Sequence, residues 1–378
     1  MTTINNNKKL TIGLPMMHAE AAETRCFLPK LVGCLEKYGA QVVLERQYGA
    51  GMGLAAEDYL RAAPALTFAD NDQVFQQDLV LVLRCPEEQR IRSMRCGACL
   101  ISMLHYATRP KRIDLLRKLG LQAISLDSIS DDSGRRMVEN FNAVAWNGME
   151  AAFNLLQQIY PQPGFFNPAR PPLQVTLIGA GNLGGHTVRA AVRYGNPALQ
   201  EELSRSGVPG VIVSAVDLDI TNHTQVMHDL LAKTDILVDA SSRANTTRAI
   251  IPNSWLSYLP PHAIILDLCV DPYQQVGDEF HTKGIEGIPQ GDLDQYVFAP
   301  DDPVFGTIPG HIPSGERRHT VSCYSWPGIH PDECMQVYSA QLHPLMRTLV
   351  SQGGLQGIRQ HGNFFERAIS RALLSNHQ

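Results

Sequence analysis

Three residues able to bind or protonate a small anion follow short apolar runs in the first third of the sequence. Arg25 lies in the loop after KKLTIGLP, Arg84 ends DLVLVLR, and His105 ends ACLISMLH. Each guanidinium offers a forked pair of donors for a carboxylate, and an imidazole gives and takes protons near neutral pH. The three predict a site for a small anionic substrate. The alternative is that His105 caps a strand end and the arginines are surface residues.

The segments that carry these residues alternate between strand and helix patterns. Strands are predicted at 8–15, 41–45, 78–84, 98–105 and 121–127, and helices at 27–40 and 110–120. This alternation predicts a mostly parallel sheet covered by helices. Ligands of such sheets bind beyond the carboxyl ends of the strands, which is where the three residues lie.

A glycine-rich turn in QVTLIGAGNLGGHTVRAAVRYG, residues 174–195, joins an apolar strand to a helix pattern. Glycines permit a tight turn and bring the backbone close to a pyrophosphate at the helix N-terminus. We therefore assign dinucleotide binding to this turn, specifically to Gly179, Gly181, Asn182, Leu183 and Gly184. An ordinary strand-to-helix connection can also have this G-x-G-x-x-G pattern, so the motif alone does not decide.

Polar residues at the ends of the following strands support the dinucleotide assignment. Asp217 ends VIVSAVD, where a carboxylate accepts hydrogen bonds from ribose hydroxyls, and this favours NAD over NADP. Its spacing from the glycines is longer than usual because NPALQEELSRSGVPG intervenes. Ser241, after DILVDA, either caps a helix or contacts the nucleotide. In AIILDLCVD, one of Asp267 and Asp271 is expected near the reactive end of the cofactor, and the other can cap a helix.

Length and composition exclude several classes of function. A chain of 378 residues with a net charge of −5 fits two domains and has no basic footprint for nucleic acid or membrane surfaces. With no long apolar span and no apolar signal segment, we expect a cytoplasmic protein. Cys96 and Cys99 form one C-x-x-C without a matching pair. A core strand is therefore favoured over a zinc or redox site, and no metal is expected.

The domain prediction places the boundary near Met137, where a helix pattern leads away from the first domain. A stiff, proline-rich connector, PQPGFFNPARPP, then joins this helix to the strand before the glycine-rich turn. Residues 1–139 and 330–378 form a substrate domain, completed by helix patterns at 333–351 and 363–374. Residues 140–329 form an NAD-binding Rossmann domain, so the fold class is α/β with two doubly wound domains and an active-site cleft between them. A segment rich in Gly, Pro and Asp lies at 287–316, and a loop of this length in a compact domain is usually functional or disordered.

Several motifs in order resemble the alanine dehydrogenase and transhydrogenase NAD-binding superfamily, which includes lysine-forming saccharopine dehydrogenases. They are TIGLP with Arg25, YGAGMGLAAEDY, LHYATRP, IGAGNLGG, AVDLD, LDLCVD and YSWPGIHP. The resemblance implies that Arg25 binds the substrate carboxylate, that His105 is catalytic, and that Asp271 is the aspartate of the catalytic region. It also places Trp326 in the loop near the nicotinamide.

The sequence departs from the alanine enzymes at three places. Arg84 stands where they have a lysine, and because a guanidinium stays protonated, His105 is the only acid/base candidate. Ser325 and Trp326 replace a polar and a flexible apolar residue, so an indole can reshape the pocket. The 287–316 segment has no counterpart and is predicted to form a lid or an oligomer contact.

These features predict an NAD-dependent amino-acid dehydrogenase that is similar to alanine dehydrogenase. The expected reaction is the reversible oxidative deamination of a small amino acid to its keto acid by hydride transfer. Arg25 and Arg84 hold the carboxylate, His105 handles the proton, and Asp271 binds near the nicotinamide or orients a water. The chain is expected to form a homo-oligomer. Two alternatives are open: a saccharopine-type secondary-amine dehydrogenase or imine reductase, and a catalytically silent NAD-binding module.

Overall fold

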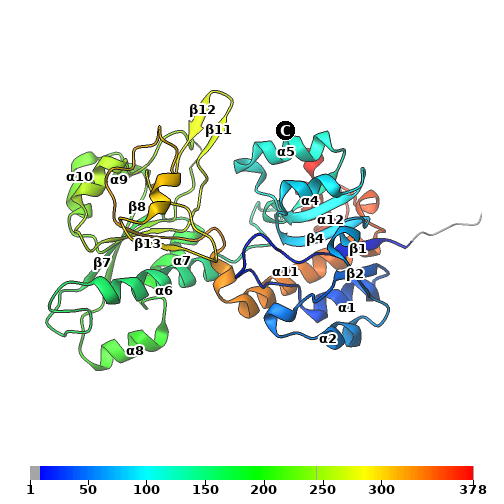
Figure 1. Ribbon diagram of the computed structural model, residues 1–378, viewed down its shortest axis with the longest axis horizontal. Coiled ribbons are helices and arrows are strands. Elements are labelled where there is room, and N and C mark those ends of the chain that lie inside the picture. The colour runs from blue at the N-terminus through cyan, green and yellow to red at the C-terminus, as the bar shows by residue number, and fades with distance from the viewer. Residues whose placement is uncertain (1–8, 244, 378) are drawn as a thin grey trace, which may run out of the picture. The chain divides into compact units, whose positions relative to one another are not determined.

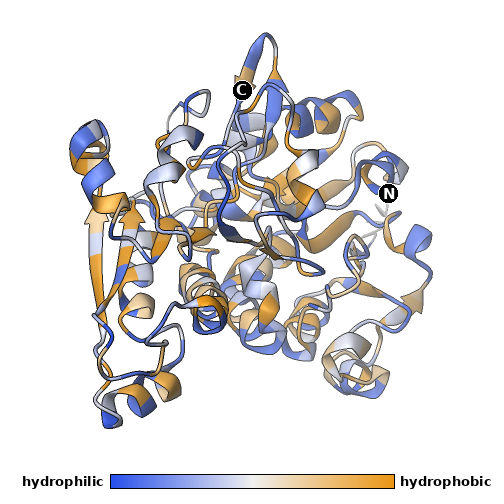
Figure 2. Ribbon diagram, turned by 60° about the vertical axis from the view of Figure 1, so that its left-hand side comes forward, coloured by the Kyte–Doolittle hydropathy of each residue, from blue (hydrophilic) through white to orange (hydrophobic). Residues whose placement is uncertain are grey.

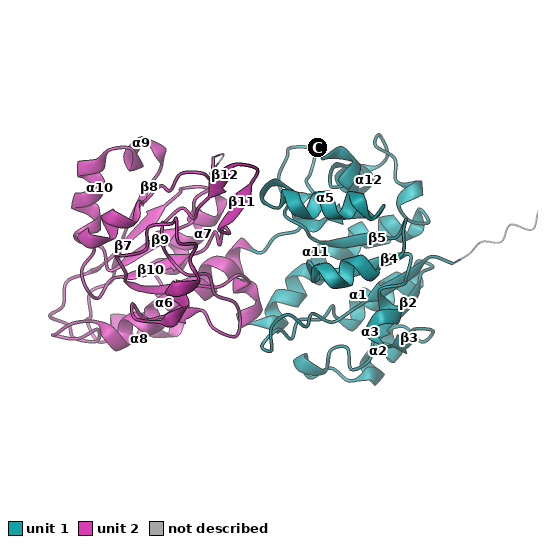
Figure 3. Ribbon diagram, turned by 45° about the horizontal axis from the view of Figure 1, so that its top comes forward, with its two compact units in different colours: residues 1–140, 330–378 teal, residues 141–329 magenta. Residues whose placement is uncertain are grey.

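The computed structural model describes residues 9–243 and 245–377, which divide into two compact units (Figure 3). Unit 1 combines the chain up to Asn140 with the segment from His330 onward, and unit 2 is Phe141–Ile329. Each unit is built on one six-stranded sheet. The long C-terminal helix α11 (Pro331–Ser351) and α12 (Phe364–Arg371) belong to unit 1.

The sheet of unit 1 is parallel throughout. Its strands are β1 (Thr11–Leu14), β2 (Gln41–Glu45), β3 (Thr67–Ala69), β4 (Leu79–Arg84), β5 (Cys99–Met103) and β6 (Gln122–Ser125). They run in the order β3-β2-β1-β4-β5-β6, so the chain starts in the middle and winds outward to both edges. This order reverses between β1 and β4, which is the position where doubly wound sheets bind ligands.

Apolar residues of the central strands face two cores, one on each side of this sheet. In β4, Leu79, Leu81 and Leu83 face a core that includes α1 (Pro29–Lys37), α11 and α12. Val80 and Val82 face the other core, with α4 (Glu88–Ser93) and α5 (Pro110–Lys118) (Figure 1). Two short helices complete the unit, α2 (Ala56–Ala62) and α3 (Asn71–Val74). Because both faces are covered, the strands read as continuous apolar runs.

The sheet of unit 2 has the order β13-β14-β10-β9-β7-β8. Its strands are β7 (Leu173–Ile178), β8 (Val211–Val216), β9 (Ile236–Asp239), β10 (Ile264–Asp267), β13 (Val297–Phe298) and β14 (His319–Ser322). All neighbours are parallel except β13, which is antiparallel to β14. A separate hairpin joins β11 (Gln274–Val276) to β12 (Glu279–His281).

Helices cover both faces of this second sheet as well. One core contains α6 (Phe141–Ile159), α7 (Asn182–Ala191) and α8 (Pro197–Arg205). The other contains α10 (Thr224–Leu231), which follows the short α9 (Leu218–Thr221). Figure 2 shows the strands mostly at the hydrophobic end of the colour scale. The prediction of an α/β protein with two doubly wound sheets is therefore confirmed.

The 287–316 segment is partly structured. It contains β13 and a 3₁₀-helix at Pro303–Thr307, and it has a small core of its own in which Phe298, Phe305 and Ile308 are buried. Its predicted role as a lid or an oligomer contact stays a prediction, as does the cleft between the domains. Among the described residues, no helix is both long and apolar enough to span a membrane.

Candidate functional site

The two predicted substrate arginines share a buried glutamate in unit 1. Glu23 accepts hydrogen bonds from Arg25 Nε at 2.9 Å and from Arg84 Nη1 at 3.0 Å. A second glutamate, Glu20, accepts from Arg84 Nη2 at 2.5 Å. Burial opposes ionisation of Glu23, but the hydrogen bonds and charges of Arg25 and then Arg84 give it a pKa below its ordinary value. The arginines are thus brought together, each already paired with a carboxylate.

Glu20 and Glu23 were missed by the sequence analysis, which treated the arginines as open anion receptors. Both glutamates lie in AEAAETR, directly before Arg25, so two acids close to a candidate binding arginine were the available signal. Glu23 and Glu20 lie 61 and 64 positions before Arg84 in the sequence, so their pairing with it depends on the fold. A substrate carboxylate would have to compete with, or add to, these ion pairs.

His105 lies at the same carboxyl edge, just beyond β5, the neighbour of β4. Its backbone has φ +52°, the left-handed region that few non-glycine residues adopt and that often marks a functional position. The ring nitrogen Nδ1 lies 3.4 Å from Asp127 Oδ2, and the backbone N–H of His105 donates to Asp127 Oδ1 at 3.1 Å. The imidazole is 40% exposed, so it is held on one side and open on the other.

Asp127 is the residue that orients His105. It is buried and also accepts from Ser125 Oγ at 2.7 Å. Burial alone would raise its pKa, but the hydrogen bond and charge of His105, with the Ser125 hydroxyl, hold that pKa well below its ordinary range. Asp127 therefore remains a carboxylate beside the imidazole, an arrangement that fixes the ring and leaves Nε2 for proton transfer. Its position at the end of LQAISLD was the sequence signal for it.

The glycine-rich turn of unit 2 requires glycine at two positions. Gly179 has φ +98°, and a Cβ there would lie 2.7 Å from the carbonyl oxygen of Ala240. A Cβ on Gly184 would lie 2.2 Å from the carbonyl oxygen of Gly179. Gly181, by contrast, has open space around it and is the N-cap of α7. The N–H groups of Asn182, Leu183 and Gly184 in the first turn of this helix are available to an anion.

Alanine substitutions at the adjacent Gly184 and Gly185 should have different effects on stability and cofactor binding. Gly184→Ala should lower both the melting temperature and the affinity for NADH, because its Cβ would collide with the turn. Gly185→Ala is the matched control, since nothing lies within 4 Å of a Cβ there. Thermal unfolding and NADH fluorescence titration measure the two effects. Equal behaviour of the two variants would show that the close approach of Gly184 is not needed.

The remaining nucleotide-site predictions fall at the ends of β8 and β9. Asp217 is exposed and N-caps α9, accepting from the Leu218 N–H at 2.9 Å. Ser241 donates from both its backbone N–H and its hydroxyl to Asp239 Oδ1, at 3.0 and 2.6 Å. Both residues lie at the same edge of the sheet as the glycine turn.

Asp271 and Trp326 have partners that the sequence analysis did not anticipate. Asp271 Oδ2 accepts from Arg243 Nη2 at 2.6 Å, and the Arg243 side chain is only 6% exposed. Trp326 is 1% exposed and donates from Nε1 to the carbonyl oxygen of Asp267 at 2.9 Å. Its indole is part of the core of unit 2, and the predicted contact with the cofactor stays a prediction.

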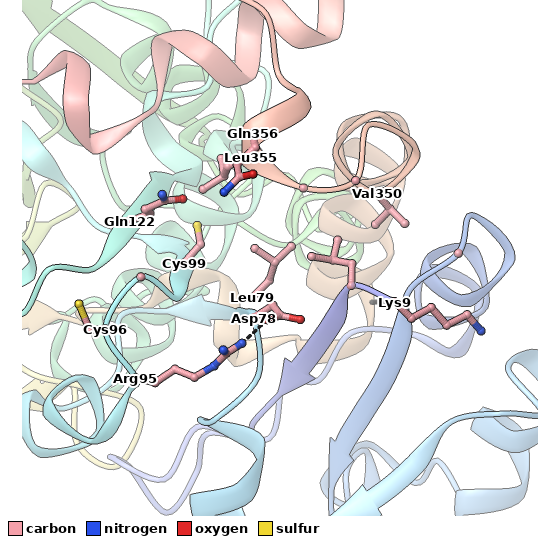
Figure 4. A pocket seen from close by; sticks show the side chains of 15 residues that line it. Lys9, Asp78, Leu79, Arg95, Cys96, Cys99, Gln122, Val350, Leu355 and Gln356 are labelled. Carbon is pink, nitrogen blue, oxygen red and sulfur yellow. Dashed lines mark hydrogen bonds and ion pairs between the residues drawn. The ribbon is translucent and has the colours of Figure 1, made fainter. Parts of the chain in front are cut away.

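Unit 1 also has a pocket of about 580 Å³ at the opposite edge of its sheet (Figure 4). It is lined by residues that precede or begin β1, β4, β5 and β6, including Asp78, which is ion-paired with Arg95. Cys96 and Cys99 also line it. No group of three or more His, Cys, Asp or Glu is placed to hold a metal ion in the described part of the chain. None of the predicted site residues lines this pocket.

Comparison with known proteins confirms the predicted resemblance. Residues 19–145 match the family model for the alanine dehydrogenase/PNT N-terminal domain. The alanine dehydrogenase of Bacillus subtilis (strain 168) is 23% identical over 273 residues, covering 69% of this chain and 71% of that protein. Subunit alpha of the NAD(P) transhydrogenase of Haemophilus influenzae is 22% identical over 213 residues, covering 52% of this chain and 41% of that protein.

Solved structures show the same fold. An L-alanine dehydrogenase has a TM-score of 0.68 and 19% identity, with 96% of this chain and 94% of that chain covered. A transhydrogenase from Sinorhizobium meliloti has a TM-score of 0.60 and 17% identity, with 91% and 95% covered. The similarity in fold therefore extends over nearly the whole chain, through both units.

Proposed function

We propose that this protein is an NAD-dependent dehydrogenase that acts on a carbon–nitrogen bond of an amino acid. The observation that carries the proposal is the His105–Asp127 pair, which lies at the same sheet edge as Arg25 and Arg84. The glycine turn of unit 2 supports the cofactor, and the relatives named alanine dehydrogenase support the reaction class.

In the oxidative direction, NAD would supply the acceptor for a hydride from the substrate carbon that carries nitrogen, and the glycine turn and the first turn of α7 would hold it. Arg84 and Arg25 hold the substrate carboxylate within their cluster with Glu20 and Glu23. His105 takes the proton released at the substrate nitrogen or from the attacking water, and the Asp127 carboxylate stabilises the imidazolium that forms. Asp271, fixed by Arg243, binds near the reacting carbon or orients the water.

The paired glutamates favour a second candidate, a secondary-amine dehydrogenase that joins a keto acid to an amino acid. Two buried carboxylates pair with the two arginines, so the charges of these four side chains cancel and offer little attraction to a simple keto acid. A neutral, charge-paired cluster also suits an amino acid, which brings an ammonium and a carboxylate together. A small amino acid with ammonia as the nitrogen source remains the first candidate.

A screen of NADH oxidation distinguishes these candidates. Each keto acid is supplied either with ammonia or with an amino acid as the nitrogen source. Turnover with ammonia supports the amino-acid dehydrogenase, and turnover only with an amino acid supports the secondary-amine dehydrogenase. Absence of turnover in every combination, with NADH still bound, would contradict both and favour a silent NAD-binding module.

The identity of the cofactor depends on Asp217. Its carboxylate would accept from the ribose hydroxyls, and charge-assisted hydrogen bonds of this kind are worth about 1.5–3 kcal/mol. Asp217→Ala should therefore raise the Kd for NADH by roughly 10- to 100-fold. Asp217→Asn keeps an acceptor for the Leu218 N–H and should weaken NADH less while improving NADPH. Unchanged affinities in fluorescence titrations of both cofactors would remove Asp217 from the site.

A further inference from the structure

Two buried aspartates of unit 2 lie beside Asp271, and the proposed function does not use them. Asp239 ends β9 and Asp267 ends β10, and the parallel register places them next to each other. The same row continues to Ile178 on β7 in one direction and to Ser322 on β14 in the other. Because Gly179 follows Ile178, this row lies at the sheet edge where the nucleotide turn begins.

The tripeptide Thr282–Gly284 contacts Asp267 and Asp239 and also the arginine that pairs with Asp271. The carbonyl oxygen of Thr282 accepts from Arg243 Nη2 at 2.8 Å, and the same nitrogen donates to Asp271. Lys283 Nζ lies 2.8 Å from Asp267 Oδ2, and a Cβ on Gly284 would lie 2.1 Å from Asp239 Oδ2. One short segment therefore contacts the carboxyl ends of β9 and β10, and through Arg243 it is linked to Asp271.

The ion pair at the centre of this arrangement is fully enclosed. The side chains of Lys283 and Asp267 are 1% and 2% exposed. Asp267 Oδ2 also accepts from Ser322 Oγ at 3.1 Å, so the carboxylate is held from two directions. A buried pair of charges of this kind is costly to desolvate and is weak evidence for added stability. Its geometry points instead to a role in positioning.

The other oxygen of Asp267 holds the turn that leads to Asp271. Asp267 Oδ1 accepts from the Val270 N–H at 2.8 Å. Val270 has φ +53°, an unfavourable conformation for a β-branched residue that persists only where its surroundings impose it. Asp271 is the next residue, so the direction in which it leaves the strand end depends on this strained turn.

We infer that the Lys283–Asp267 ion pair is a positioning device for Asp271. Lys283 fixes the Asp267 carboxylate, Asp267 fixes the Val270 turn, and that turn presents Asp271 to Arg243. Thr282 fixes Arg243 from the other side. Lys283 is a positioning residue and not a catalytic one, because its ammonium is enclosed. The expected effect of Lys283 on catalysis rests on the proposed role of Asp271. Its expected effect on the conformation of Val270 does not.

A double-mutant cycle tests the coupling between Lys283 and Asp271. Lys283→Met should lower kcat/KM by about 100-fold in the wild-type background, since small displacements of reacting groups have effects of this size. In the Asp271→Asn background the same change should have an effect of less than about 3-fold, because its target is already lost. Lys233→Met, an exposed lysine of the same unit, is the control and should be neutral. Additive losses would overturn the inference.

A second variant covers the case in which Lys283→Met does not fold. The pair Asp267→Asn with Lys283→Met removes both charges and leaves neither buried alone. It takes the place of Lys283→Met in the same cycle and should again lower kcat/KM only where Asp271 is present. Wild-type kcat/KM in this charge-balanced variant would overturn the inference.

Hydrogen exchange separates failure of the inference from failure of the proposed function. In the full chain, the Val270 amide should exchange at least about 10-fold faster after Lys283→Met, while amides within β9 and β10 keep their protection. This readout needs no turnover. An unchanged Val270 amide would overturn the positioning role, whereas a faster one in a protein without dehydrogenase activity would contradict only the proposed function.

Discussion

Replacing His105 by alanine should lower kcat/KM by roughly 10²- to 10⁴-fold, the usual contribution of a positioned general acid or base. The affinity for NADH should not change, because His105 belongs to unit 1 and the glycine turn to unit 2. Single-turnover kinetics and NADH titration separate the two effects. The expected loss is large because the nearby guanidinium of Arg84 stays protonated and cannot take over the proton.

The chain offers a matched control for this experiment. His262 Nε2 lies 2.7 Å from Asp235 Oδ1, so it is also a histidine paired with an aspartate. It precedes β10, at the amino end of the strands, where no ligand is expected. His262→Ala should leave kcat/KM unchanged. If His105→Ala behaves like His262→Ala, His105 is not the acid/base residue.

The architecture could be predicted because it depends on local patterns. Runs of five or six apolar residues are typical of parallel strands that are buried on both faces. In this chain they alternate with segments that have helical periodicity. Gly179 and Gly184 could be recognised because both belong to one strand–turn–helix unit, in which the backbone at Gly184 lies close to the carbonyl oxygen of Gly179. The carboxyl-edge position of His105 follows from the same reasoning, since it needs only the end of one strand.

The partners of the charged residues could not be predicted in the same way. Arg84 meets Glu20 and Glu23 only because the loop after β1 lies beside the end of β4. Asp271 meets Arg243 because β9 and β10 are neighbours, although 28 residues separate the two in sequence. The bond from the Trp326 indole to the carbonyl oxygen of Asp267 likewise joins residues 59 positions apart.

These partners change how recognition works in the proposed site. Arg25, Arg84 and Asp271 all have oppositely charged partners within 3.0 Å. Net charge therefore does little to attract the substrate. Selectivity must come from directed hydrogen bonds in a preformed network, which disfavours ligands that leave one of its groups unpaired.

Asp239→Asn should stabilise the protein at about pH 8, by up to about 3 kcal/mol of unfolding free energy. Burial, and then the charge of Asp267, raise the pKa of Asp239 from its ordinary value of 3.8 to about 6, despite the hydrogen bonds from Ser241. At a pH between these two pKa values, Asp239 keeps its proton in the folded state and has lost it in the unfolded state. The free energy of unfolding therefore falls as the pH rises from about 4 to about 6. Above this range the full destabilisation by the ionised Asp239 carboxylate is present.

The variant removes this cost because asparagine is neutral at every pH and still accepts the two hydrogen bonds from Ser241. The difference from wild type should shrink as the pH falls through about 6 and vanish near 4, where Asp239 is protonated. Urea unfolding across this range measures it, with exposed Asp229→Asn as the control. A less stable Asp239→Asn protein at the alkaline end would mean that its neighbours favour the ionised carboxylate, and that the row beneath the nucleotide turn is held together by charge.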